Sequence, residues 1–128
     1  MANIAATLRH PTVGGQTRSG VMLYTWSAMT KATDDIGTAV EVPALADRSV
    51  QVLGTLGTGG SVRIEGSNQA TPSADATDWH VLTDPQGNNL DVAALKTEAI
   101  TEPVLWIRPR ITAGDANTSL NVTILFRK

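Results

Sequence analysis

The side chains most able to bind a metal ion or to transfer a proton are few in this sequence. It has no cysteine and only two histidines, His10 and His80. Neither histidine has a second histidine, or a pair of acidic residues, at the spacing of a metal site. His80 follows Trp79 in a strand-like run, so we interpret it as an ordinary strand residue. The sequence predicts no catalytic residue, no metal ligand and no cofactor, and therefore not an enzyme.

Residues 54–60 contain four glycines, as a phosphate-binding loop does. A phosphate loop leads into a helix whose N-terminus meets the anion, whereas this loop leads into an alternating, strand-like segment. We therefore interpret residues 54–60 as the loop of a β-hairpin that joins strands at Ser49–Leu53 and Ser61–Glu65.

Asp84, Asn88 and Asp91 place three oxygen-bearing side chains close together, as a calcium site requires. Their spacing does not match that of an EF-hand loop, and Asp and Asn are ordinary turn residues. Pro85 and Gly87 suit the second and fourth positions of a type I turn. We therefore favour a turn over a calcium site.

Arg108 and Arg110 flank Pro109 in a strand-like segment, so their side chains should share one face of a sheet. They can pair with Glu65 or Glu102 inside the fold, or bind an acidic neighbour. We favour the pairing within the chain.

The three tryptophans, Trp26, Trp79 and Trp106, are the residues from which a sugar-stacking platform would be built. Aromatic residues make up only 4% of the chain, and all three tryptophans lie in strand-like runs. Packing in the core accounts for them more simply.

The composition favours a single domain with a weakly charged surface. The 128 residues fit one compact domain, and 17% of them are charged, against about 25% in typical soluble domains. A net charge of −2 gives no basic field for nucleic acid or for an anionic membrane. No apolar run is long enough for a transmembrane helix, and residues 1–8 do not resemble a signal peptide. We expect a surface that contacts other protein, with no nucleic-acid or membrane partner.

The second half of the chain has clear strand periodicity. Residues alternate between apolar and polar from Leu120 to Phe126, which predicts a half-buried strand. Val104–Arg108 is strand-like as well, with a bend, a bulge or a sheet edge expected at Pro109. The turn residues Gly114–Asn117 then predict a hairpin into the last strand.

The first half is less regular. Gly20–Thr30 is apolar on both faces, as a central or partner-covered strand is, and Met1–Pro11 suggests an arm or an edge strand. For Asp91–Ile100 we weigh one turn of helix against irregular structure. Together the segments predict an all-β fold, a β-sandwich or jelly roll of seven to nine short strands with little helix. Residues 1–128 form one domain, with 1–19 as an extended arm and loop.

Three segments carry a resemblance to a known group of proteins: Val62–Asn68, Trp79–Gly87 and Ile107–Asp115. In this order they resemble small structural proteins of tailed bacteriophages, which are encoded near the major capsid protein and include capsid cement or decoration proteins. The resemblance covers Val62–Lys128. It implies a protein of the capsid exterior, made in the host cytoplasm, that binds the major capsid protein as a dimer or trimer and ties capsid subunits together.

The sequence thus predicts a phage virion structural protein, a capsid cement or decoration protein. A tail or neck protein of the virion and a carbohydrate-binding β-sandwich module are the alternatives. We expect assembly contacts in the N-terminal arm, in the glycine-containing loop after it, on the Tyr24–Trp26 strand face and at the arginine pair: Ile4, Leu8, Arg18, Tyr24, Trp26, Arg108 and Arg110.

Overall fold

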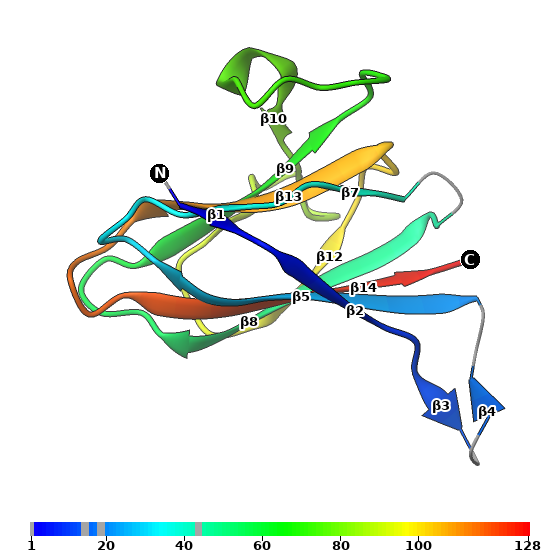
Figure 1. Cartoon of the computed structure of the whole chain (residues 1–128), viewed down its shortest axis with the longest axis horizontal. Helices are drawn as coiled ribbons and strands as arrows, with labels where there is room; N and C mark the ends of the chain where they lie inside the picture. The colour runs from blue at the N-terminus through cyan, green and yellow to red at the C-terminus, as the bar shows by residue number, and fades with distance from the viewer. Residues whose placement is uncertain (1, 14–15, 18–19, 43–44) are drawn as a thin grey trace.

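Two β-sheets face each other across one hydrophobic core (Figure 1). The computed structural model describes residues 2–13, 16–17, 20–42 and 45–128. The prediction of an all-β sandwich is confirmed, and within the described residues seven strands have four residues or more. The described helical structure is one 3₁₀ turn, Ala76–Asp78. None of the described helical structure has the length or the apolar character needed to cross a membrane.

The seven-stranded sheet has the order β1-β6-β13-β9-β10, with β11 also paired to β9 and β7 to β13. Its strands are β1 (Asn3–Ile4), β6 (Ile36–Gly37), β7 (Val40–Glu41), β9 (Ser61–Ser67), β10 (His80–Val81), β11 (Asp91–Val92) and β13 (Trp106–Ala113). The five-stranded sheet has the order β12-β8-β14-β5-β2. Its strands are β2 (Ala6–Arg9), β5 (Val21–Thr30), β8 (Asp47–Thr55), β12 (Thr97–Ile100) and β14 (Ser119–Arg127).

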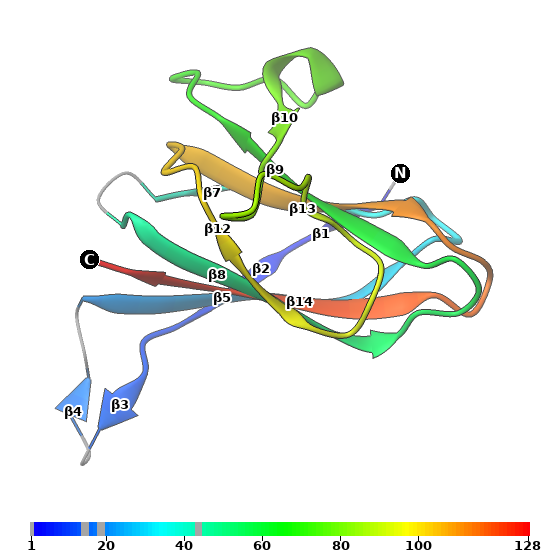
Figure 2. The same cartoon turned by 180° about the vertical axis from the view of Figure 1, so that it is seen from behind.

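The N-terminal segment is an edge strand of both sheets. β1 pairs in parallel with β6, and β2 pairs antiparallel with β5, so the chain passes diagonally from one sheet to the other (Figure 1). A short hairpin of β3 (Thr12–Val13) and β4 (Gln16–Thr17) follows, and it projects from one end of the sandwich in both views (Figure 2).

The core lies between the sheets and follows the predicted alternation. In β14, Leu120, Val122, Ile124 and Phe126 are fully buried, and the residues between them face outward. On β5, Trp26 is fully buried, and its Nε1 donates to the carbonyl of Thr38 at 3.0 Å. The buried indole therefore keeps its hydrogen bond, as a tryptophan in a core must.

Both predicted hairpins are wrong. The loop at residues 54–60 joins β8 of one sheet to β9 of the other, and Gly114–Asn117 likewise joins β13 to β14 across the sandwich. The two loops are held together where they cross, because Asp115 accepts hydrogen bonds from the amides of Thr58 and Asn117. Gly57 has a φ of 64°, and a Cβ there would lie 2.3 Å from Asp115 Oδ1, so glycine is needed for this close approach.

For Asp91–Ile100, neither of the two alternatives, one turn of helix or irregular structure, describes the segment. The segment contains two short strands, β11 on the seven-stranded sheet and β12 on the edge of the five-stranded sheet. Pairing with β9 and β8 provides the hydrogen bonds that so short a helix would have to make by itself.

Pro109 is tolerated inside β13 because β6 and β7 leave a gap beside it. β7 pairs with β13 at Trp106 and Ile107, whereas β6 pairs with it at Arg110. A proline has no amide hydrogen to give to a neighbouring strand, so an interruption of the ladder suits it. The predicted irregularity is present, and a register shift follows near Ile111.

Arg48 of β8 holds together two loops, the one between β7 and β8 and the one between β12 and β13, although its side chain has no acidic partner among the described residues. The residue is 3% exposed. Its guanidinium donates to the carbonyl oxygens of Leu45, Val42, Val104 and Glu102 at 2.6–3.3 Å. Burial lowers the pKa of this guanidinium, but an arginine stays charged at neutral pH. The carbonyls take the place of a counter-ion.

Candidate functional site: the outer face of the seven-stranded sheet

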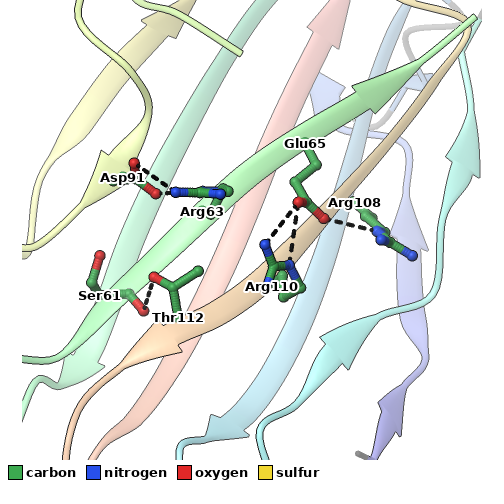
Figure 3. Close-up of polar contacts among 7 residues, drawn as sticks. All are labelled: Ser61, Arg63, Glu65, Asp91, Arg108, Arg110 and Thr112. Carbon is green, nitrogen blue, oxygen red and sulfur yellow. Dashed lines mark hydrogen bonds and ion pairs between the residues drawn. The ribbon is translucent and has the colours of Figure 1, made fainter. Parts of the chain in front are cut away.

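A buried ion network lies on the face of the seven-stranded sheet that points away from the core. Glu65 on β9 is opposite Arg108 on β13, and Arg110 is two residues farther along β13. Arg108 Nε donates to Glu65 Oε1 at 3.1 Å, while Arg110 donates to Oε2 through Nε at 3.2 Å and Nη2 at 3.1 Å (Figure 3). The predicted pairing with Glu65 is confirmed, and that with Glu102 is wrong.

The members of this network differ in their access to water. The side chains of Glu65 and Arg108 are 3% and 5% exposed, whereas that of Arg110 is 28% exposed. Arg63 and Asp91 form a second pair next to them, at 2.7 Å (Figure 3). The three arginines and two carboxylates of these two clusters carry one excess positive charge between them, and Glu41, opposite Trp106 on β7, adds a carboxylate to the same face.

Trp79 covers one face of the Arg108 guanidinium. The centre of the Arg108 guanidinium lies 4.1 Å from the centroid of the indole, within the range of a cation–π contact. The Trp79 side chain is held in turn by its Nε1, which donates to the carbonyl of Ser73 at 2.8 Å. The Ser73 amide donates to Asp78, and this hydrogen bond lowers the pKa of the Asp78 carboxyl. The loop between β9 and β10 is thus fixed above the sheet.

A groove runs between this loop and the strand edge formed by β1 and β6; we call it the Arg108 groove. It has a volume of about 390 Å³. Most of the lining is apolar or backbone, from residues 2–3, 36–39 and 71–74, together with Trp79, Trp106 and Arg108. Mostly apolar clefts of this size, with a few polar groups, are typical of ligand-binding sites.

Two side chains at the groove, those of Trp106 and Arg108, have hydrogen-bond donors that lack acceptors within the described residues. Trp106 Nε1 is buried and has no hydrogen-bond partner there. Arg108 uses its Nε for Glu65, and its two terminal nitrogens have no acceptor in the described part of the chain. An unpaired buried donor such as Trp106 Nε1 costs free energy, so the groove favours a ligand that brings an acceptor.

Arg108 is the one charged side chain among the lining residues of the groove that the structure describes. Within the described ranges, no three His, Asp or Glu side chains lie close enough to hold a metal ion. The proposed calcium residues are used otherwise: Asp84 accepts from the amides of Gln86 and Asn88, and Asp91 pairs with Arg63. The turn interpretation of residues 84–87 is confirmed, because the Gly87 amide donates to the Asp84 carbonyl at 2.9 Å.

The outer face of the five-stranded sheet is a second surface, and it carries little charge. Apart from the β3–β4 hairpin at one end, no described element lies over this face in either view (Figures 1 and 2). Two rows of outward side chains cross all five strands: Thr97, Gln51, Thr123, Thr25 and Thr7, and Ala99, Ser49, Leu125, Leu23 and Arg9. Only one of these ten residues is charged. Asp47 and Arg127 also lie on this face and pair with each other, so the face is nearly neutral and uncovered by the other described strands.

The structure places the predicted contact residues in different environments. Trp26 is wrong as a contact residue, because it is fully buried. Tyr24 also points inward and packs on the Phe126 ring at 5.9 Å, so the outward residues of this strand are Leu23 and Thr25.

Ile4 and Leu8 lie on the shared N-terminal edge strand. Ile4 packs against the core, and Leu8 is 44% exposed. Arg18 lies outside the described residues. Arg108 and Arg110 come together on the seven-stranded sheet, where only Arg110 is appreciably open to solvent.

The groove itself was not foreseen from the sequence. The signal that points toward it is the alternation of Trp106, Arg108 and Arg110, which puts all three on one face of β13. Trp79 comes to this face through the loop between β9 and β10, and no local pattern indicates that. The prediction that the tryptophans pack in the core is confirmed for Trp26 alone: Trp79 is buried against Arg108 on the outer face, outside the core, and Trp106 lines the groove.

No protein-family model matches the sequence, and neither does any curated protein sequence. The fold is similar to that of solved structures. The SPBc2 prophage-derived protein YomS matches with a TM-score of 0.58 and 8% sequence identity, over 88% of this chain and 99% of that one. The K2 cleaved adhesin domain of Lys-gingipain (Kgp) matches with a TM-score of 0.46 and 11% identity, over 98% and 84% of the respective chains. At 8% identity the likeness concerns architecture, and the chain shares its β-sandwich fold with a prophage-derived protein.

Proposed function

We propose that this protein is a non-enzymatic structural component of a tailed-phage particle, and specifically a capsid cement or decoration protein. In this role it binds the outside of the shell as a dimer or trimer and ties neighbouring major capsid subunits together. The observation that carries the proposal is the neutral outer face of the five-stranded sheet, in a fold that a prophage-derived protein shares.

The physical argument concerns the cost of covering this face. Threonine, serine, alanine and leucine side chains lose little hydration free energy when a partner covers them, compared with charged side chains. Thr25 and Thr123 already bond to each other across the strands at 3.0 Å, so they need no new partner. Weak contacts that are repeated over a symmetric shell give high avidity.

The exposed edges of the sandwich support the same role. β2 and β12 are the outer strands of the five-stranded sheet, and each leaves backbone groups unpaired on one side. A neighbouring chain can add a strand to such an edge. Leu8 on β2 and Leu95, just before β12, are exposed apolar side chains at these two edges.

Particles produced from the genome that encodes this chain test the proposal. Quantitative mass spectrometry of purified particles should give a copy number comparable to that of the major capsid protein, and cryo-microscopy should place the sandwich on the capsid exterior. A copy number far below that of the capsid protein, with density at the neck or tail, would favour the tail or neck alternative. Particles without the chain would refute a virion role.

The neutral face can be tested separately with a matched pair of variants. Thr123→Arg places a charge at the centre of the face, whereas Thr112→Arg places one on the outer face of the opposite sheet. We expect the first variant to lose binding to shells that lack the protein, and the second to retain it. Equal binding by both variants would contradict the use of this face.

A further inference from the structure

We propose that the Arg108 groove binds an acidic segment of a partner protein, with an aspartate or glutamate side chain seated between Arg108 and Trp106. This inference does not depend on the virion role, because it follows from the groove alone. The occupant is a peptide carboxylate next to apolar residues.

The charge of the site favours a carboxylate. Arg108 is 4% exposed and shares its single acidic partner, Glu65, with Arg110. One carboxylate between two guanidinium groups leaves an excess positive charge. The two terminal nitrogens of Arg108, which have no acceptor among the described residues, match the two oxygens of a carboxylate.

The arginine is also held in place before a ligand arrives. Its Nε is bonded to Glu65, and its flat face lies on Trp79. A fixed guanidinium loses little side-chain entropy on binding, which raises affinity. Trp106 adds a second donor, whose Nε1 is buried without a partner.

The remaining lining indicates a peptide and not a free small anion. The groove has a volume of about 390 Å³, far more than one carboxylate fills, and its walls include Ile36, Ala39, Pro72 and Ala74. Such walls suit apolar side chains and the backbone on either side of the acidic residue. A glycan fits less well, because Arg108 covers the near face of Trp79 and that indole is 5% exposed.

The test is a titration of the whole chain with the capped, amidated peptide Ac-Gly-Glu-Ile-Glu-Gly-NH₂, followed by NMR of the three indole N–H signals. The capped peptide carries carboxylates only on its glutamate side chains. We expect the Trp106 signal to shift downfield at concentrations up to about 10 mM, since even a weak complex is populated there. The Trp26 signal should stay in place, because that indole is buried and bonded to Thr38.

Four comparisons make the experiment decisive. The peptide with glutamine in place of glutamate should leave the signals unchanged. Trp106→Phe removes a donor that bonds to nothing within the described residues, so the fold should persist while affinity, followed in this variant by the Trp79 signal, falls roughly 5-fold. Arg108→Lys keeps the charge but loses the paired donors, and affinity should fall roughly 10-fold, whereas the exposed Arg127→Lys should bind as the original chain does.

Several results would overturn the proposal. No shift of the Trp106 signal by the glutamate peptide would refute it directly, and so would equal shifts by the glutamine peptide. A shift of the same signal by a neutral glucose hexasaccharide, but not by the peptide, would show that the groove is a glycan site. These outcomes are independent of where the protein lies in a particle.

Discussion

Replacing Glu65 with glutamine is the sharpest test of how the outer face of the seven-stranded sheet is held. Glutamine keeps the size of the side chain but removes the only carboxylate that Arg108 contacts among the described residues, and the Arg108 side chain is 5% exposed. Removing one partner of a buried ion pair costs about 3–5 kcal/mol, because the other charge stays buried. The Arg110 side chain is 28% exposed, so water can hydrate it when Glu65 is replaced, and it adds less to the loss of stability. We expect Glu65→Gln to lower the free energy of unfolding by about 3 kcal/mol.

The assay is urea denaturation at pH 7, followed by tryptophan fluorescence and circular dichroism. For a domain of this size, 3 kcal/mol corresponds to a fall in Tm of roughly 10 °C. The matched control is Asp47→Asn, which breaks the ion pair between Asp47 and Arg127. Both side chains of that pair are more than half exposed. A surface pair of this kind contributes about 0–1 kcal/mol.

The result that would refute the reasoning is a loss below about 1 kcal/mol for Glu65→Gln, with an unchanged m-value. Such a value would mean that Arg108 is hydrated or finds another acceptor. The double variant Glu65→Leu with Arg108→Met provides a further check. If the loss comes from an unpaired charge and not from shape, this variant should regain most of the stability.

Three further predictions concern other parts of the fold. In Gly37→Ala, the added Cβ would lie 2.6 Å from Pro109 Cδ and 2.7 Å from Trp26 Cδ1, so we expect a loss of about 1–3 kcal/mol in urea denaturation. In Arg48→Met, the carbonyls that the guanidinium satisfied become unpaired, and calorimetry should show a loss of about 3 kcal/mol. Asp115 titrates below its ordinary pKa of 3.8, mainly because the Thr58 amide donates to it, so its stabilising effect is present above pH 3.8 and is lost as pH falls through the lowered pKa. NMR of the Thr58 amide should follow that loss.

Local periodicity was enough to predict the strands but not their partners. The alternation of Leu120–Phe126 gives the burial of β14 residue by residue, because a strand with one buried face repeats every two residues. The loop at residues 54–60 and the Gly114–Asn117 turn have hairpin composition, yet each crosses to the other sheet. The sheet to which each loop leads is decided by the long-range pairing of β14 with β8 and of β13 with β9. Turn residues carry no information on that pairing.

In the candidate site, too, some contacts could be predicted from the sequence and others could not. The shared face of Arg108 and Arg110 and their pairing with Glu65 follow from strand geometry and charge. The position of Trp79 over Arg108 does not, because it depends on how the loop between β9 and β10 folds back over the sheet. Trp26 was predicted both as a core residue and as a contact residue, because β5 is apolar on both faces and its pattern gives no preferred side.

The three segments that resemble phage proteins are also the ones that build this face. Val62–Asn68 contributes Glu65, Trp79–Gly87 contributes Trp79, and Ile107–Asp115 contributes both arginines. Glu65 keeps the Arg108 guanidinium in place on the indole, so the network that stabilises the sheet also orients the donors of the groove. Stability and binding should therefore fall together when Glu65 is replaced, whereas replacing Trp106 should affect binding alone.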